Sequence, residues 1–296
     1  MVSYKKRATR KENIMKYHLL LREDNLKKYE NHLRQEEKSK ATIEKYLRDV
    51  RHLIGFLSDK GTINKDIMIT YKNHLIKSYA VSSANTMLTS INNYLGFMKM
   101  PDLKVKLFKI QRKVFCGEDQ ELTKSEYMRL LKTSDKDETR RIHLIMQTIC
   151  STGIRIGELQ YFTIEAIKKR KIEVYNKGKC RIIFIPRKLC EKLSEYAAVR
   201  GIKEGCIFIT RNNRPVNRSN IWAEMKKLCT EADVDVGKVY PHNLRHLFAR
   251  TYYQTEKDII KLADIMGHSS IDTTRVYTVS TGKEHEKQIS CLKLLI

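Results

Sequence analysis

The sequence predicts a mainly α-helical protein with one small β-hairpin, divided into two domains. Apolar residues recur at helical spacing through most of the chain, whereas β-forming residues are concentrated in two adjacent short runs, KIEVY and CRIIFI. The length of 296 residues exceeds the size at which a single core is usual. A strongly basic, weakly periodic stretch separates the two halves. We therefore expect an all-helical first domain and an α+β second domain.

The composition favours a polyanion as the partner. Lys and Arg number 58 against 34 Asp and Glu, which gives a formal net charge of +24. Such an excess favours nucleic acid, because Lys and Arg release the counterions condensed on its phosphates. The basic residues are spread from Lys5 to Lys293, and no window of about 20 apolar residues is present. A membrane partner is therefore not expected.

The cysteines and the amino-terminal sequence favour a cytoplasmic protein. The seven cysteines form no Cys-x-x-Cys pair, and several stand among apolar residues, where a reduced thiol packs as a small hydrophobic group. The first residues are basic but lack a long apolar run and a small-residue cleavage site, so no signal peptide is predicted. We expect the protein in the bacterial cytosol or on the nucleoid.

The first half begins with a basic arm and continues as a helical bundle. Residues 1–22 lack a clear period and are expected to form a flexible arm or a loosely docked helix. Residues 23–105 are expected to form the helical domain. Its clearest helix, SKATIEKYLRDVRHLIGFLSDKG, has Ser39 or Thr42 as its cap and Gly61 as its stop. Two further helical patterns complete the bundle: IMITYKNHLIKSY and SSANTMLTSINNYLGFMK.

A basic linker is predicted between the domains, over residues 106–120. Its composition suits an extended segment that lies along a phosphate backbone. The next segment, LTKSEYMRLLK, opens with Thr123 and Glu126 at capping-box spacing, in which each side chain satisfies an otherwise unpaired amide at the helix start. This helix is expected to begin the second domain.

The second domain is predicted over residues 121–281, followed by a tail at 282–296. Its expected elements are a helix from 139, a break at Gly153, a short helix to 162, the hairpin, a helix at 187–200, a strand at CIFIT, a turn at RNNRP, and helices at 219–232, 242–254, 257–266 and 270–277. The tail ends in an apolar stripe. It is expected to be an interaction segment, and docking within its own protomer or on a neighbour both remain open.

Five short motifs in the second domain carry residues suited to phosphate chemistry. Each is weak alone, because an arginine beside glycine, a lysine in a turn or a lone histidine is usually structural. The pattern is specific because all five motifs occur in one domain and in a fixed order. The motifs are TGIRIGEL with Arg155, YNKGKC with Lys177, HNLRH with His242 and Arg245, MGHSS with His268, and TTRVYT with Tyr277.

Together these motifs resemble the catalytic set of the tyrosine recombinase family, which includes phage integrases and Xer-type recombinases. The family pattern is Arg, Lys, His-x-x-Arg, His or Trp, then Tyr, and the match covers residues 121–281. The first half is similar, more loosely, to the family's core DNA-binding domain. The resemblance implies a two-domain, site-specific recombinase that cleaves and rejoins DNA through a 3′-phosphotyrosine. The resemblance also implies a role in integration and excision of a mobile element or in Xer-like resolution.

Phosphoryl transfer explains why these residue types are needed. Attack on phosphate places extra negative charge on its nonbridging oxygens, and the guanidinium forks of Arg155 and Arg245 suit a clamp for them. His242 and Arg245 are three residues apart, so on a helix they share one face. Tyr277 is the expected nucleophile. Its phenol has an ordinary pKa of about 10 and needs a base, for which His242 is the candidate.

The resemblance also implies a general acid and a further phosphate ligand. In the family a lysine at the hairpin tip protonates the leaving 5′ oxygen; Lys177 is the candidate and Lys179 its rival. His268 is expected to hydrogen-bond a phosphate oxygen. Two further residues are left outside the catalytic set. Glu158 is either a group that orients Arg155 or an ordinary carboxylate on a helix face. His246 is expected to support the site without contacting the phosphate.

No metal and no cofactor are expected. His242 and His246 lack the glutamate of an HExxH zinc site, and nucleotide-binding glycine motifs are absent. The expected partners are double-stranded DNA and further copies of the chain, which form a homo-tetramer on paired sites, with accessory DNA-bending proteins as optional partners. A type IB topoisomerase-like enzyme and a non-catalytic DNA-binding protein remain as alternatives. The target sequence and the directionality stay open.

Overall fold

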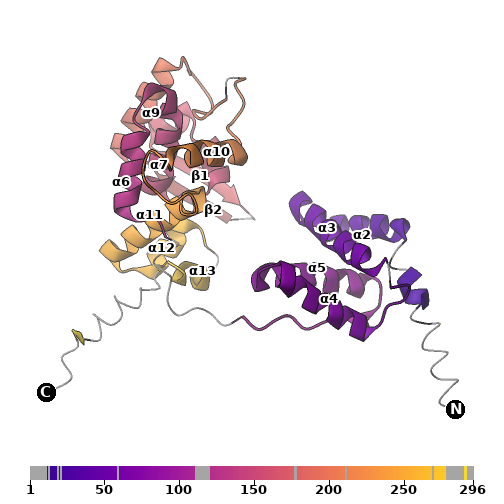
Figure 1. Cartoon of the computed structure of the whole chain (residues 1–296). Coiled ribbons are helices and arrows are strands. Elements are labelled where there is room, and N and C mark those ends of the chain that lie inside the picture. Colours follow the sequence, from indigo (N-terminus) through magenta and orange to yellow (C-terminus); the bar gives the residue numbers. More distant parts are fainter. Residues whose placement is uncertain are drawn as a thin grey trace, which may run out of the picture. The chain divides into compact units, whose positions relative to one another are not determined.

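The computed structural model forms two compact units, residues 1–112 and 113–296 (Figure 1). The described residues are 12, 14–18, 20, 22–58, 60–110, 121–176, 179–210, 212–268, 270–277 and 290–291. Helices dominate both units, and one antiparallel hairpin lies in the second. The predicted fold class, mainly α with a small hairpin, is confirmed.

The first unit is an all-helical bundle. Its elements are α2 (Glu23–Gln35), α3 (Lys40–Leu57), α4 (Lys65–Ser78), α5 (Val81–Phe97) and the short 3-10 helix η1 (Pro101–Leu103). The side chain of Ser39 accepts a hydrogen bond from the amide of Thr42, so Ser39 is the cap of α3. Helix α3 packs against both α2 and α5, and its apolar face contributes to the core.

The core of the first unit extends into the predicted amino-terminal arm. Tyr29 and Tyr94 are fully buried at its centre, with ring centroids 4.9 Å apart. Tyr17 and Leu20 are buried in the same core. The hydroxyl of Tyr94 donates to the carbonyl of Leu20 at 3.3 Å. The described part of residues 1–22 therefore includes a docked helical segment.

The start of the predicted linker lies along α5. Asn92 exchanges two hydrogen bonds with the backbone of Val105, at 2.8 and 3.0 Å. Asn85 makes the same pair of bonds with the backbone of Phe108, at 2.9 and 2.8 Å. Two asparagine side chains thus satisfy an extended segment in place of a partner strand. Residues 111–120 lie outside the described residues.

The second unit combines helices with the hairpin. Its elements are α6 (Lys124–Thr133), η3 (Asp137–Thr139), α7 (Arg140–Thr152), η4 (Ile156–Tyr161), α8 (Ile164–Lys169), β1 (Lys171–Asn176), β2 (Lys179–Phe184), α9 (Arg187–Val199), α10 (Arg218–Leu228), α11 (Pro241–Glu256), α12 (Ile259–Met266) and α13 (Ile271–Arg275). The predicted capping box is confirmed, because Thr123 and Glu126 each accept a hydrogen bond from the backbone amide of the other.

The predicted hairpin is confirmed as the antiparallel pair of β1 and β2. Ile172, Val174 and Ile183 face the core, whereas Tyr175 and Phe184 are exposed. This alternation is the one expected of a sheet with one buried face. One face of the hairpin is therefore fixed against the second unit.

The predicted strand at residues 206–210 is wrong. The segment makes only single-residue bridges, to Thr163 and Pro215, and joins no named strand. Ile207 and Phe208 are buried in the core of the second unit. The apolar run reflects this burial rather than sheet pairing, and a short apolar run alone does not separate the two cases.

Helices α7 and α11 pack together in the second unit. Helix α7 ends at Gly153, whose φ of +63° is left-handed. A side chain at Gly153 would clash with the ring of Phe248 on α11. This close approach sets the chain direction at Ile154 and brings Arg155 beside the first turns of α11.

The six cysteines in the described ranges are free thiols. In the same ranges, no group of three or more His, Cys, Asp or Glu side chains is placed to hold a metal ion. Nor does any helix there have the length and apolar character needed to cross a membrane.

Candidate active site

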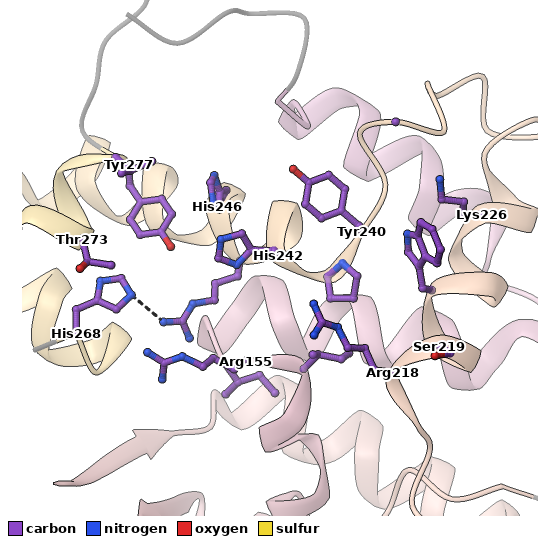
Figure 2. A pocket seen from close by; sticks show the side chains of 17 residues that line it. Arg155, Arg218, Ser219, Lys226, Tyr240, His242, His246, His268, Thr273 and Tyr277 are labelled. Atoms are coloured by element: carbon purple, nitrogen blue, oxygen red, sulfur yellow. Dashed lines mark hydrogen bonds between the residues drawn. The ribbon is translucent and has the colours of Figure 1, made fainter. Parts of the chain in front are cut away.

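A cavity of about 870 Å³ opens beside the first turns of α11 (Figure 2). Five of the six residues predicted for catalysis line it: Arg155, His242, Arg245, His268 and Tyr277. They come from the cap of η4, from α11, from the residues after α12 and from the residues after α13. The fold therefore gathers side chains that are widely separated in sequence.

The sixth predicted residue, Lys177, lies outside the described residues. Its rival, Lys179, begins β2, where its backbone is paired with that of Asn176. Both lysines belong to the same hairpin, so the choice between them remains open.

Tyr277 follows the short helix α13 and is 5% exposed. Its backbone amide donates to the carbonyl of Thr274 at 2.9 Å. The ring of His246 meets the tyrosine ring edge-on, with centroids 4.6 Å apart and an interplanar angle of 90°. The ring of His268 lies nearly parallel to it, at 5.8 Å and 18°. The tyrosine is thus held between two imidazoles at the wall of the cavity (Figure 2).

Arg245 carries a buried positive charge and is 2% exposed. Its guanidinium donates to the carbonyls of Gly153 at 2.5 Å and Met266 at 2.6 Å, and to Nε2 of His268 at 3.2 Å. Burial, followed by the charge of Arg155, lowers its pKa to about 10. The group stays charged at neutral pH, so it is a fixed cation that lines the cavity.

Arg155 is oriented by Glu158, which is 5% exposed. The backbone amide of Arg155 donates to Glu158 Oε2 at 2.7 Å, and its guanidinium donates to Oε1 at 3.3 Å. The carboxylate therefore contacts both ends of the same residue. Of the two sequence-based interpretations of Glu158, these contacts support the orienting group.

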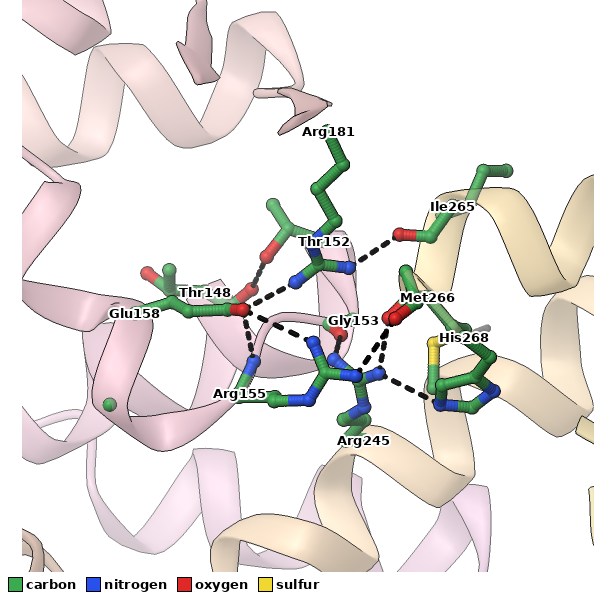
Figure 3. A network of polar contacts seen from close by, with 12 residues as sticks. Thr148, Thr152, Gly153, Arg155, Glu158, Arg181, Arg245, Ile265, Met266 and His268 are labelled. Carbon is green, nitrogen blue, oxygen red and sulfur yellow. Dashed lines mark hydrogen bonds and ion pairs between the residues drawn. The ribbon is translucent and has the colours of Figure 1, made fainter. Parts of the chain in front are cut away.

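The C-terminal end of α12 holds three guanidinium groups (Figure 3). The last carbonyls of a helix have no partner within the helix and carry partial negative charge. Each of the last three carbonyls here accepts from a different arginine: Ile265 from Arg181 at 2.7 Å, Met266 from Arg245 at 2.6 Å, and Gly267 from Arg155 at 3.1 Å. One helix end thus fixes three cations directly before His268.

The hydrogen bonds of His268 define its neutral tautomer. A guanidinium can only donate, so Nε2 of His268 accepts from Arg245. The proton therefore sits on Nδ1, which donates to Oγ1 of Thr274 at 2.9 Å. Burial and the charges of Arg245 and Arg155 lower the pKa of His268 to about 4. The imidazole is uncharged at neutral pH.

His242 and His246 lie one turn apart on α11, with ring centroids 4.5 Å apart. Burial of the ring is the main cause that lowers the pKa of His242, and the positive charges of Arg245 and Arg155 lower it further. Burial, followed by His242 and Arg245, lowers the pKa of His246 to about 4. Both imidazoles are mainly neutral at neutral pH and able to accept a proton.

Sequence reasoning missed Arg181 and one wall of the cavity. Arg181 occupies a core-facing position of β2, and a charge in an otherwise apolar, core-facing row is a signal that could have found it. The missed wall comes from α10 and the segment before α11. Its members include Arg218, Trp222, Lys226 and Tyr240. Lys226 Nζ lies 4.5 Å from the centre of the Trp222 ring.

Comparison with known families gives two matches along the chain. The profile of the phage integrase family matches residues 120–284, which is more than half of the chain. The profile of the phage integrase N-terminal SAM-like domain matches residues 26–100.

Two similar curated proteins extend over nearly the whole chain. Tyrosine recombinase XerA of Pyrococcus furiosus is 27% identical over 283 residues, which are 93% of this chain and 96% of the relative. Tyrosine recombinase XerC of Pseudomonas entomophila is 27% identical over 285 residues, 86% of this chain and 91% of the relative.

Solved structures share the fold at low sequence identity. A lambda integrase dimer bound to a COC′ core site gives a TM-score of 0.69 at 16% identity, covering 86% of this chain and 94% of that chain. The XerH post-cleavage complex with palindromic difH substrate gives 0.68 at 18% identity, covering 84% and 79%.

A mainly helical, two-unit fold with arginine, histidine and tyrosine side chains around one cavity is that of a tyrosine recombinase. The chain belongs to the phage integrase family. Its class of reaction is site-specific cleavage and rejoining of DNA, in preference to the topoisomerase-like and non-catalytic alternatives.

Proposed function

We propose that the hydroxyl of Tyr277 attacks a DNA phosphate and leaves a 3′-phosphotyrosine and a free 5′-hydroxyl. The bond from phosphorus to the tyrosine oxygen forms while the bond to the 5′ oxygen breaks. The number of phosphoester bonds is unchanged, so rejoining by a second 5′-hydroxyl needs no ATP. The observation that carries this proposal is the convergence of Tyr277, three guanidinium groups and three imidazoles on one cavity.

Arg155 and Arg245 bind the nonbridging oxygens of the attacked phosphate. Charge on these oxygens increases as the phenol attacks, and guanidinium donors stabilise it. Both groups are already fixed by backbone carbonyls of the α12 end, so little reorganisation is needed when charge develops. Removal of one preorganised donor of this kind slows a reaction by about 10²–10³-fold.

His242 removes the proton of Tyr277. Its lowered pKa keeps the imidazole unprotonated at neutral pH, which a base requires. His268 binds a phosphate oxygen. In the structure its Nε2 accepts from Arg245, so Nε2 needs a proton, gained by protonation of the ring or by a change of tautomer, before it can donate to phosphate. An anionic phosphate favours that protonation, because negative charge nearby raises the pKa of an imidazole.

A lysine of the hairpin protonates the leaving 5′ oxygen. An alkoxide is a poor leaving group, so a general acid at this atom accelerates cleavage. Lys177 is the first candidate and Lys179 the second.

Double-stranded DNA is the partner. It is bound by a core-binding domain at residues 23–105 and a catalytic domain at residues 121–281. The remaining segments are an arm at 1–22, a linker at 106–120 and an interaction tail at 282–296. The SAM-like match at residues 26–100 supports the first assignment. A similar structure at TM-score 0.69 and 16% identity is a lambda integrase tetramer bound to a Holliday junction, which supports a tetramer on paired sites. The Xer relatives favour resolution, and a Tn1549 transposon integrase of similar fold favours a mobile element.

The test is covalent capture on a DNA substrate nicked near the scissile phosphate, so that the short product escapes. Genomic fragments selected for specific binding supply the site. The wild-type protein is expected to form an adduct that survives denaturing detergent, and Tyr277→Phe is expected to form none. Tyr253→Phe, a ring outside the cavity, is the control and should retain the adduct. An adduct in Tyr277→Phe, or none from wild type on specifically bound DNA, contradicts the proposal.

A further inference from the structure

We propose that Arg181 is a positioning residue that couples the β1–β2 hairpin, and the general acid that the hairpin carries, to the arginine clamp. The inference rests on the proposed function, since it assigns a structural cause to the placement of the acid.

Arg181 is a charged residue on the core-facing side of the hairpin. It pairs with Val174 across the sheet, and its neighbour in the same row, Ile183, is buried. The Arg181 side chain is only 11% exposed. Burial lowers its pKa, and its Nε has no hydrogen-bond partner among the described residues. A buried ion pair of this kind is often no better for stability than a pair of apolar side chains of similar volume, so stability alone does not explain why Arg181 and Glu158 are present.

The two ends of the Arg181 fork contact two parts of the active site (Figure 3). Nη2 is paired with Glu158, the carboxylate that also holds Arg155. Nη1 donates to the carbonyl of Ile265 at 2.7 Å, one residue before the carbonyl that holds Arg245. One guanidinium thus bridges β2, η4 and the end of α12.

Gly267 leaves the room that this bridge needs. A Cβ at Gly267 would lie 2.6 Å from Cδ of Arg181 and 3.0 Å from its Nε. The φ of Gly267 is +63°, so a glycine is favoured there on two grounds. The stem of Arg181 therefore lies directly on the peptide that precedes His268.

Arg181 acts through other residues rather than on the phosphate. Arg155, Arg245 and His268 line the cavity, whereas Arg181 and Glu158 are not among its lining residues. Arg181 belongs to the strand that leads directly from the hairpin tip. Loss of its two contacts removes the polar link between β2 and the clamp, and we expect the acid to lose its exact position.

The chemistry of the leaving group separates this role from a role in phosphate binding. A substrate with sulfur in place of the scissile 5′ oxygen expels a thiolate. Thiols are far more acidic than alcohols, with a pKa of about 8.5, so this departure needs no general acid. A variant that has lost only the positioned acid should therefore recover on the sulfur substrate, whereas a variant that has lost a phosphate donor should not.

The experiment measures single-turnover adduct formation on matched oxygen and sulfur suicide substrates. Arg181→Met and Arg181→Lys are expected to lose about 10²-fold on the oxygen substrate and most of that loss should vanish on the sulfur substrate. The ratio of the two rates within one preparation is independent of the fraction of folded enzyme. Of Lys177→Ala and Lys179→Ala, the variant that removes the acid gives the pattern of a missing acid. Arg155→Ala gives the pattern of a missing phosphate donor.

Arg141 supplies the matched control. It also donates to a carbonyl, that of Ile209 at 3.0 Å, and to a carboxylate, Glu224 at 2.5 Å, and its Nε also has no partner among the described residues. Arg141→Met should leave the oxygen-to-sulfur ratio of the wild type unchanged. Equal losses on both substrates for the Arg181 variants, or no loss on either, would overturn the inference. A wild type that forms no Tyr277-dependent adduct on either substrate would instead contradict the proposed function.

Discussion

At the residue scale, Arg245 is a charged side chain that the fold buries almost completely. Among the described residues, no carboxylate forms an ion pair with Arg245. Its guanidinium is held by two backbone carbonyls and by the acceptor nitrogen of His268. A planar guanidinium can serve these three directions together, and a lysine ammonium cannot match that geometry. Position 245 therefore depends on arginine for stability as well as for the proposed binding of phosphate.

Arg245→Lys is expected to slow adduct formation by about 10²–10³-fold, because one preorganised donor of the transition state is lost. It should also lower the melting temperature, because Gly153 and Met266 lose a donor to their carbonyls. Single-turnover rates and thermal melts of the same preparation measure the two effects. Wild-type rates from a folded Arg245→Lys enzyme would exclude Arg245 from the clamp.

The histidines of the site predict how stability depends on pH. The folded pKa of His246 is about 4, below its ordinary value of about 6.5, so the unfolded chain binds more protons between these values. The free energy of unfolding should therefore be undiminished by this group above about pH 6.5 and fall as the pH decreases towards 4. His246→Phe keeps an aromatic ring and removes the titration. Urea unfolding across this window should give a flatter pH dependence for the variant, and an equal slope would refute the assignment.

The motif residues were predictable and their supporting residues were not. Each of Arg155, His242 and Tyr277 stands in a short sequence pattern, and the structure brings them to one cavity. Arg181 has no such pattern, because its partners Glu158 and Ile265 are distant in sequence and are brought to it only by the fold.

At the scale of the element, the end of α7 positions the first arginine of the site. Gly153 adopts a left-handed conformation, approaches α11 closely, and gives its carbonyl to Arg245. The break at this glycine was predictable from sequence. The contact with Phe248 was not, because it joins two helices that lie far apart in the chain.

Gly153→Ala is expected to destabilise the second unit by at least about 2 kcal/mol, from left-handed strain and from the clash with Phe248. Adduct formation should fall with it, since the carbonyl that holds Arg245 is displaced. Gly157→Ala is the control, because a side chain there would meet no atom within 4 Å. Denaturant unfolding measures both variants. Equal stability of the two would contradict this account of the α7 end.

The hairpin and the mistaken strand show what periodicity can and cannot supply. KIEVY and CRIIFI are adjacent and joined by a turn, so local sequence was enough to predict their pairing. Residues 206–210, CIFIT, are also rich in β-forming residues, but they are buried by tertiary packing rather than by pairing in a sheet. No local signal distinguishes an apolar core segment from a strand.

At the scale of the whole molecule, the chain has two compact units and a net charge of +24, and this charge favours binding to DNA. The division into two units was predictable from the change in pattern near the basic stretch. The extension of the first core into Tyr17 and Leu20 was not, because isolated apolar residues in a basic segment reveal their burial only when the helices assemble.

The charge predicts a steep dependence of DNA affinity on salt. A protein that neutralises six to ten phosphates loses about 10³–10⁵-fold in affinity between about 50 and 200 mM salt. We expect this chain to lie in that range, as measured by fluorescence anisotropy on a duplex at several salt concentrations. An affinity that hardly changes with salt would show that phosphate contacts do not dominate binding.

Mass spectrometry of the covalent adduct can identify the amino acid that carries the DNA. The covalent adduct is trimmed with nuclease, digested with trypsin and analysed by mass spectrometry. Cleavage after Arg275 and Lys283 gives the peptide VYTVSTGK, whose one tyrosine is Tyr277. We expect this peptide to carry a nucleotide through a 3′ phosphate. A nucleotide on any other peptide, or on a serine or threonine of this one, would contradict it.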